Sequence, residues 1–401
     1  MRTHTVKLGE VAVVKGGKRL PKGVGLITTP NSHPYIRVRD LNGKCPLELN
    51  NTFEFVDDNT QATISKYTVN SGDIVLSIVG TIGLVSIVGS SLNRANLTEN
   101  CVKLTALPNI DRDFLYYFLK SPYGQQKIAQ GTVGAVQAKL PIKNIQNIEI
   151  NLPDIKVQKE IASILSSLDN KIFVNDNIND NLQQQAAALF ESWFINYDPW
   201  DGVQPSEWEN APLGSFVEIK RGGSPRPIQD FLSDSGLRWL KISDVTSLSS
   251  PFVLEIKEHI KEEGLRKTVF LHAGELVLSN SATPGIPKIL DVDTCIHDGW
   301  LYFPKSELSK YYLYLFFKHI RKELVALGNG SVFTNLKTDI LKAFPATKAD
   351  ESTLKEFDAL VTPLFDAMLN ADRENFKLAA MRDALLPKLM SSEIDVSEVE
   401  L

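Results

Sequence analysis

Apolar and polar positions along this chain of 401 residues follow two different periods, and each of them occurs twice. Short apolar stretches at 34–39 and 72–79 predict strands, and a longer stretch at 112–130, ended by Gly131, predicts a helix. The same three elements return later, as strands at 237–243 and 274–280 and a helix at 309–327 ended by Gly328. The pattern predicts an α+β fold with two similar modules, at 1–153 and 213–348.

A second pattern follows each module, at 154–196 and 349–391, where apolar residues recur at alternating steps of three and four. The seam residues are Ile161, Leu165, Leu168, Ile172, Leu182, Ala186, Leu189 and Trp193 in the first segment, and Phe357, Val361, Leu364, Met368, Ala371, Leu378, Leu385 and Leu389 in the second. Such a heptad seam predicts a long helix. Because ~40 helical residues span ~60 Å, each helix is expected to pack on a partner surface. Asn179 and Asn375 fall on equivalent seam positions, where they either fix the register of the helices or face water between them.

The two halves also match residue by residue when the second is shifted back by about 200 positions. Leu8-Gly9 returns as Leu213-Gly214, YIRVRDL at 35–41 as WLKISDV at 239–245, and GDIVLS at 72–77 as GELVLS at 274–279. Because Gly, Asp and Lys recur as well as the apolar pattern, we interpret the likeness as an internal repeat. The Pro- and Gly-rich segment 197–212 is expected to be a linker, and 392–401 an acidic tail.

Charge is distributed in the same alternating way. The whole chain has a formal charge of -5 and a pI near 5.8. Residues 1–153, however, hold 17 Lys and Arg against 11 Asp and Glu, and residues 211–348 hold 18 against 15. Residues 154–210 hold 3 against 10, and residues 349–401 hold 5 against 12. The modules are basic and the helical segments acidic, which favours two polyanion-binding modules on acidic supports.

Composition and motifs exclude several classes of function. The chain is 43% hydrophobic and 23% charged, as in a globular protein, and contains neither a signal-peptide pattern nor an apolar run of transmembrane length. Three widely spaced cysteines suit reduced thiols, so a cytoplasmic location is expected and no metal site. Phosphate-loop, dinucleotide-binding, zinc-protease and serine-hydrolase motifs are absent, as is the motif typical of amino-methyltransferases. We therefore expect a chain that is not itself a catalyst.

Three pairs of loops, at matching positions of the repeat, carry the candidate DNA-binding residues. The first pair is basic and glycine-flanked, which would let the backbone approach phosphate, although a solvated turn is the alternative. The second lies at a strand edge, where Arg could contact guanine and Asp cytosine unless they form an ion pair within the module. In the third, Gln137 and Asn335 could bind adenine, with a structural turn as the alternative. The residues are Lys15, Lys18, Arg19, Lys22, Lys220, Arg221 and Arg226; Arg37, Arg39, Asp40, Lys241, Ser243 and Asp244; and Gln137, Lys139, Asn335 and Lys337.

These features together resemble the specificity (S) subunits of type I restriction-modification enzymes, the HsdS family. The resemblance rests on the Leu-Gly opening of each module, the YIRVRDL and GDIVLS strands with Gly80 and Gly83, the LPDI string at 152–155 followed by Gln158, and LFESWF at 189–194. It covers nearly the whole chain. The second helix departs from it, since it opens with ESTLK at 351–355 instead of the Pro-x-x-x-x-Gln phrase.

The resemblance implies two target recognition domains, each reading one half of an asymmetric bipartite site in double-stranded DNA, joined by two long helices that pair as an antiparallel coiled coil. It implies two modification subunits, which methylate adenine, and restriction subunits as partners. S-adenosylmethionine, ATP and Mg²⁺ are expected on those subunits, and no cofactor on this chain. Apolar residues of the first helix beyond the need of a two-helix seam are expected to bind these partners, namely Phe173, Phe190, Trp193 and Phe194.

A different class of function is compatible with the same pattern. The chain could be a coiled-coil scaffold whose modules bind protein partners rather than DNA. Salt dependence distinguishes the two, because binding through several Lys and Arg contacts to phosphate weakens steeply with salt, whereas an apolar interface does not.

Overall fold

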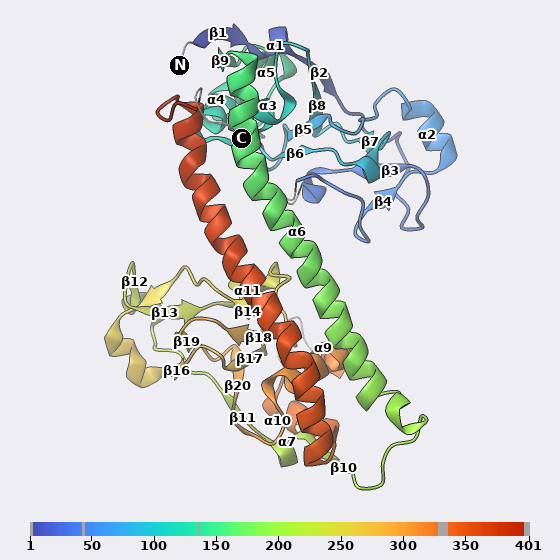
Figure 1. Cartoon of the computed structure of the whole chain (residues 1–401), viewed down its shortest axis with the longest axis vertical. Coiled ribbons are helices and arrows are strands. Elements are labelled where there is room, and N and C mark those ends of the chain that lie inside the picture. Colours follow the sequence, from blue (N-terminus) through green and yellow to red (C-terminus); the bar gives the residue numbers. More distant parts are fainter. Residues whose placement is uncertain (1–2, 42–44, 135–136, 328–335, 397–401) are drawn as a thin grey trace. The chain divides into compact units, whose positions relative to one another are not determined.

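The computed structural model describes residues 3–41, 45–134, 137–327 and 336–396, and the chain divides into two compact units. Unit 1 consists of Met1–Val174 and Phe376–Leu401, and unit 2 of Asn175–Asn375. Each unit contains one of the two expected modules together with parts of both long helices (Figure 1). In the part of the chain that is described, no helix is long and apolar enough to cross a membrane.

The described residues of the module in unit 1 form three sheets. β1 (Thr3–Lys7) pairs antiparallel with β9 (Glu149–Pro153), which joins the two ends of the module. The central sheet has the order β2-β8-β5-β6, with bounds Ala12–Gly16, Cys101–Ala106, Ile74–Ser77 and Val85–Ile87. The third sheet has the order β4-β3-β7, with bounds Glu54–Phe55, Pro34–Ile36 and Asn96–Leu97, and β3 and β7 run parallel.

Short helices connect and cover these sheets. Helices α1 to α5 have the bounds Leu8–Val11, Asp58–Ile64, Arg112–Lys120, Pro122–Gly131 and Ile142–Gln146, and the 3₁₀ turns η1 and η2 the bounds Val38–Asp40 and Ser90–Leu92. The single helix expected at 112–130 is therefore two helices. The Ser121 hydroxyl accepts the Gly124 N–H at 3.0 Å and caps α4, and Pro122 lies in the first turn, where its missing N–H costs no hydrogen bond.

The core of unit 1 forms where α3 packs between the central sheet and the long helices. All six residues from Phe114 to Leu119 are buried. At the start of the first long helix, the Gln158 side chain accepts the Asp111 N–H at 2.9 Å and donates to the Pro153 carbonyl at 2.9 Å. The Pro-x-x-x-x-Gln phrase thus fastens the helix to its own module.

Unit 2 repeats this arrangement with two larger sheets. β10 (Glu209–Pro212) pairs antiparallel with β21 (Pro345–Lys348), as β1 does with β9. One five-stranded sheet has the order β11-β20-β17-β18-β14, with bounds Val217–Arg221, Trp300–Ser306, Leu276–Ser279, Pro287–Leu290 and Phe252–Val253. The other has the order β12-β15-β13-β19-β16, with bounds Leu232–Ser233, His259–Ile260, Leu237–Leu240, Thr294–Ile296 and Val269–Leu271. β13 runs parallel to β19, as β3 does to β7, so the repeat extends to strand direction.

The other elements in the described residues of unit 2 are helical. Helices α7 to α10 have the bounds Leu213–Phe216, Ile242–Thr246, Lys310–Leu327 and Thr338–Lys342, and the 3₁₀ turns η3 to η5 the bounds Asp198–Trp200, Ile228–Asp230 and Glu262–Lys267. The segment expected to be a linker, 197–212, is partly ordered into this unit. Its last four residues form β10, whose backbone hydrogen bonds join the two ends of the module.

The strands expected at 34–39 and 237–243 end early, at Ile36 and Leu240. In unit 1 the Asp40 carboxylate accepts the Arg37 backbone N–H at 2.7 Å, and in unit 2 Asp244 accepts that of Lys241 at 2.9 Å. A side chain that captures this N–H favours a helical turn over the sheet ladder. The strand expectation at 37–39 and 241–243 was wrong for that reason.

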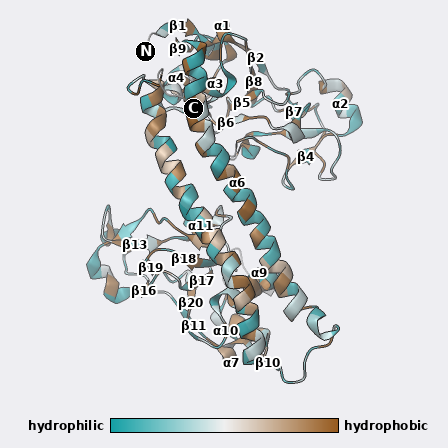
Figure 2. Cartoon of the chain, viewed as in Figure 1, coloured by the Kyte–Doolittle hydropathy of each residue, from teal (hydrophilic) through white to brown (hydrophobic). Residues whose placement is uncertain are grey.

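Two long helices are present, as expected: α6 (Ile155–Phe194) and α11 (Glu351–Met390). Within unit 1 the Arg382 guanidinium lies 2.6 Å from Asp169, and within unit 2 the Asn175 amide donates to Asn375 at 2.9 Å. Four residues further along α6, the Asn179 amide donates to Asp372, which precedes Asn375, so the helices pair antiparallel. Figure 2 shows hydrophobic and hydrophilic residues alternating around both helices, as a packed seam requires.

The seam asparagines form a symmetric pair of contacts inside unit 2. The Asn179 amide donates to Asp372 at 2.8 Å, and the Asn375 amide donates to Asp176 at 3.0 Å. Asn179 is buried, at 5% exposure, so it does not face water. Because each Asn meets an Asp of the other helix, a shifted register would bury unpaired polar groups, which favours the register-fixing interpretation.

The expectation of exposed aromatic residues at the end of α6 was wrong. Phe190 and Phe194 are 1% and 3% exposed, and both rings pack on Phe357 and Tyr312 in the core of unit 2. Trp193 and Phe173 are partly buried, and the Trp193 ring packs edge-on against Trp200. The LFESWF string therefore joins α6 to the module that follows it.

Candidate nucleic-acid interface

The first candidate loop follows β2, and its central glycine has a structural task. A Cβ at Gly17 would lie 2.0 Å from the carbonyl oxygen of Thr98, and one at Gly222 would lie 2.3 Å from that of His297. The Gly17 N–H donates to the Cys101 carbonyl at 3.0 Å. Because the chain itself fills the space beside these two glycines, the interpretation that they admit a phosphate was wrong.

The cations of this loop in unit 1 are all exposed. The Lys18 ammonium lies 5.4 Å from the centre of the Tyr67 ring, and the Arg19 Nε lies 2.6 Å from Glu99 Oε1 with its side chain 80% exposed. Lys15 and Lys22 are exposed as well. Single weak contacts of this kind leave the charges accessible to a polyanion.

The matching loop of unit 2 carries cations that are each held by one neighbour. Lys220 lies 2.9 Å from Glu218, and Arg226 lies 3.0 Å from Asp298. The Arg221 guanidinium donates to the backbone carbonyl of Asp298. Asp298 thus organises this loop, and its pKa is lowered: burial opposes the shift, but the Ser224 hydroxyl and Arg226 outweigh it.

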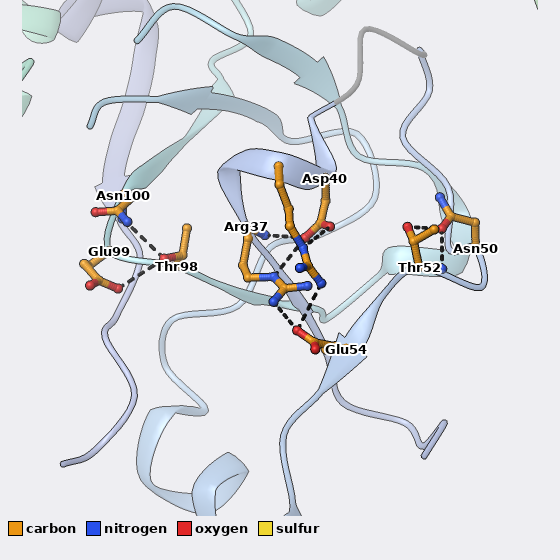
Figure 3. Close-up of polar contacts among 9 residues, drawn as sticks. Arg37, Asp40, Asn50, Thr52, Glu54, Thr98, Glu99 and Asn100 are labelled. Carbon is orange, nitrogen blue, oxygen red and sulfur yellow. Dashed lines mark hydrogen bonds and ion pairs between the residues drawn. The ribbon is translucent and has the colours of Figure 1, made fainter. Parts of the chain in front are cut away.

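The second candidate group lies in the turn after β3 and is drawn in Figure 3. Arg37 and Arg39 both contact the Glu54 carboxylate, Arg39 at 3.1 Å, and both also approach Asp40, at 3.6 and 3.7 Å. The structure therefore contains the ion pairs that were the alternative to DNA contact. Arg39 still has an exposed side chain, at 59%, whereas that of Arg37 is 21% exposed.

Asp40 is buried beneath these arginines, at 6% exposure. Burial raises the pKa of its carboxyl to about 6, and the Glu54 charge adds to this, while Arg39 opposes it. A carboxylate that is buried and already accepts the Arg37 N–H cannot reach a cytosine at a DNA surface. Asp40 belongs to the frame of the turn.

Unit 2 builds the same turn with different side chains. The Lys241 ammonium contacts Glu258, and Asp244 accepts the Lys241 N–H. Ser243, at the position of Arg39, is exposed. The two turns thus share their carboxylates and differ in their exposed residue.

The third candidate loop of unit 1 lies between α4 and α5. Val133 and Lys139 form an isolated antiparallel bridge, Lys139 also bridges Val79, and Gln137 is exposed between them. In unit 2 Lys337 is exposed immediately before α10, and Asn335 lies outside the described residues. DNA contact by Gln137, Lys139 and Lys337 stays a prediction.

The candidate residues missed by the sequence reasoning are carboxylates. Glu54, Glu99, Glu258 and Asp298 each hold one or two of the candidate cations. One signal was present, because Glu54 and Glu258 both follow their cation partner by 17 residues. Over the described residues, no group of three or more His, Cys, Asp or Glu is placed to hold a metal ion.

Comparison with known proteins gives a consistent result. The family model described as "Type I restriction modification DNA specificity domain" matches residues 3–184 and 205–347. The chain is 24% identical over 347 residues to the type I restriction enzyme MjaIX specificity subunit of Methanocaldococcus jannaschii, which covers 82% of this chain and 79% of that protein. It is 23% identical over 329 residues to the HindI specificity subunit of Haemophilus influenzae, with 64% and 71% covered.

Among solved structures, the S subunit of a type I restriction-modification system from M. genitalium matches with a TM-score of 0.60 at 17% identity, and covers 97% of this chain and 96% of that one. This likeness concerns the fold. The first span matched by the family model covers the first module and much of α6, the second covers the second module, and together they make up most of the sequence. The protein-binding scaffold is therefore not favoured, and the chain belongs to the type I restriction-modification specificity subunits, with two copies of their DNA specificity domain.

Proposed function

We propose that this chain is the non-catalytic, sequence-reading subunit of a type I restriction-modification enzyme. The observation that carries this proposal is the pair of DNA specificity domains, each basic in a chain that is acidic overall. Exposed cations recur at equivalent loops of both domains. Such a distribution supports binding of phosphate by both modules.

Each module reads one half of an asymmetric bipartite site in double-stranded DNA. Support comes from the equivalent turns, which keep Asp40 and Asp244 in the same role but expose Arg39 in one unit and Ser243 in the other. Shared residues maintain the frame, and unlike exposed residues give the two halves different sequences.

The long helices set the spacing of the half-sites and bind two modification subunits, which in turn recruit restriction subunits. Apolar side chains left exposed on the helices support this role. Phe376 and Met381 of α11 are 50% and 53% exposed, and Val174 of α6 is 48% exposed. Such residues on an acidic helix are typical of an interface with another protein. S-adenosylmethionine, ATP and Mg²⁺ bind to those partner subunits, which carry out the chemistry.

Sequencing of methylated adenines tests this function. The chain is expressed with its modification subunits, and the control is the same complex without the chain. We expect methylation at two defined sequences separated by an unspecified spacer. Methylation that is independent of the chain, or confined to one undivided sequence, would contradict the proposal.

Salt dependence tests the DNA contacts directly. Lys18→Ala with Arg19→Ala should weaken binding to all sequences and lower the slope of log affinity against log salt by up to ~2, at ~0.9 per phosphate contact. An unchanged slope would favour a module that binds protein.

A further inference from the structure

The turn after β3 and the turn after β13 share internal contacts. In each turn, some residues hold the backbone in place, which we call framing residues, and others are exposed. In each turn a cation is bound by a glutamate 17 residues later, Arg37 by Glu54 and Lys241 by Glu258. The glutamates occupy equivalent places, because Glu54 is opposite Tyr35 in the β3–β4 pair and the Glu258 carbonyl accepts the N–H of Trp239. Since this framework recurs, it cannot account for a difference in what the two modules bind.

An exposed position that differs in charge between the two turns is the one two residues after the bound cation. Arg39 occupies it in unit 1, with its side chain 59% exposed, and Ser243 occupies it in unit 2, also exposed. Asp40 and Asp244, one residue further on, both accept a backbone N–H of their own turn. Within each turn, the exposed side chain between the two framing residues is therefore free to differ.

The geometry of Arg39 suits a guanine. One nitrogen, Nη2, is held 3.1 Å from Glu54 Oε2. A guanidinium has five N–H donors, so donors other than the one held by Glu54 remain on a side chain that is 59% exposed. Two parallel donors of this kind match the O6 and N7 acceptors of guanine in the major groove.

We propose that Arg39 reads a guanine in the half-site of unit 1, that Glu54 is its positioning residue, and that Ser243 occupies the same reading position in unit 2. The proposal rests on the DNA-reading function given above. Glu54 holds Arg37 and Arg39 through one carboxylate oxygen. This contact restricts a long, flexible side chain before DNA arrives and so lowers the entropic cost of the base contact.

Arg39→Ser tests the reading role, in the complex with modification subunits and with methylated sites sequenced. We expect the preference for guanine to fall on the order of tenfold at one base pair of one half-site, while the other half-site is unchanged. The control is Arg19→Ser, which removes another exposed arginine with a single carboxylate partner and should weaken binding without changing the motif. A motif left intact at every position by Arg39→Ser would overturn the proposal.

Glu54→Gln tests the positioning role. The variant should still prefer guanine at that base pair. The strength of this preference should be intermediate between that of the wild type and that of Arg39→Ser. A role confined to stability would lower the melting temperature and leave the base preference as in wild type, which would overturn the positioning role. If the variant does not fold, Glu54→Asp, which keeps the charge and shortens the side chain, takes its place with the same expected result.

Ser243→Arg tests the equivalence of the two turns. In the described part of the chain the Glu258 Oε2 atom is buried and has no hydrogen-bond partner, so an acceptor is available to the new arginine. We expect a new guanine preference in the half-site of unit 2 and no change in that of unit 1. An unchanged second half-site would overturn the equivalence. Failure of the proposed function itself would look different, since the wild-type complex would then show no bipartite motif.

Discussion

Gly17 illustrates how one residue type can suggest a binding role and serve a structural one. Next to four cations, a glycine suggests close approach of the backbone to phosphate. In the fold, its missing side chain allows two backbone segments to cross, and the carbonyls of Leu97 and Thr98 occupy the space that a Cβ would need. The cations of the loop are nevertheless exposed, so only the interpretation of the glycine changes and not that of the cations.

Gly17→Ala should therefore destabilise unit 1. The added Cβ would lie 2.0 Å from Thr98 O and 2.4 Å from Leu97 O, and backbone atoms cannot move aside cheaply. We expect the free energy of unfolding to fall by ~2 kcal/mol or more, as for overpacking in a core. Urea denaturation measures it. Gly25→Ala is the matched control, because nothing lies within 4 Å of its Cβ position; equal effects of both substitutions would contradict the account.

The Asp40 carboxyl should make the stability of the protein depend on pH, and a single substitution can separate this effect from that of other groups. Its pKa rises from 3.8 to about 6 on folding, chiefly because of burial, so ionisation opposes the folded state. The contribution of the group to stability is greatest below pH 3.8, declines as the pH rises to about 6, and is constant above. Asp40→Asn lacks this decline, and its Oδ1 can still accept the Arg37 N–H.

Unfolding of wild type and Asp40→Asn, compared between pH 4 and pH 7, measures the effect. Relative to the wild type, we expect the free energy of unfolding of the variant to increase by ~1–2 kcal/mol as the pH rises from 4 to 6. Above pH 6 we expect no further change. A difference between the two proteins that does not vary with pH would show that Asp40 is not the titrating group.

At the scale of single elements, each long helix carries some apolar side chains that are covered by the modules and others that are exposed. At the end of α6, Phe190 and Phe194 belong to the core of unit 2, whereas on α11 Phe376 is half-exposed. In the sequence all three are aromatic residues of a long helix that lie outside the heptad seam. Only the position of the neighbouring module distinguishes the side chains it covers from those available to another protein.

Serine substitutions at Phe190 and Phe376 should therefore have opposite effects. Phe190→Ser should cost ~3–5 kcal/mol of stability, since it empties a buried aromatic site. Phe376→Ser should leave the melting temperature near that of wild type and reduce co-purification with the modification subunit. Calorimetry and affinity capture measure the two outcomes. Lys377→Ser, at an exposed neighbouring position, is the control for a general surface effect; retention of the subunit by Phe376→Ser would rule out this surface.

At the scale of the whole molecule, both units share α6 and α11, and each pairs them antiparallel. If these helices set the separation of the half-sites, their length should determine the number of base pairs in the spacer of the DNA site. One heptad adds ~10 Å at 1.5 Å per residue, or ~3 base pairs, which also turns one half-site by about a third of a helical turn. Three heptads add ~31 Å, close to one full turn.

Matched insertions near Asn175 and near Ala371 test this ruler. One heptad in both helices should largely abolish function, and three in both should restore it on sites with a spacer ~9–10 base pairs longer. Insertion of three heptads in α6 alone is the control, because it breaks the antiparallel register. Sequencing of methylated sites gives the spacer, and an unchanged spacer in the three-heptad variant would show that other parts of the chain determine it.

Periodicity and repetition in the sequence were sufficient to predict the two modules, their mixed α and β structure and the two long helices. These features depend on local pattern, since a heptad seam or an amphipathic strand is encoded by neighbouring residues. The tertiary structure alone decided which residues meet across long separations. Glu54 holds two arginines, and Phe190 is covered by Phe357. Ion pairing and burial depend on what surrounds a residue in space, and that is decided when the chain packs.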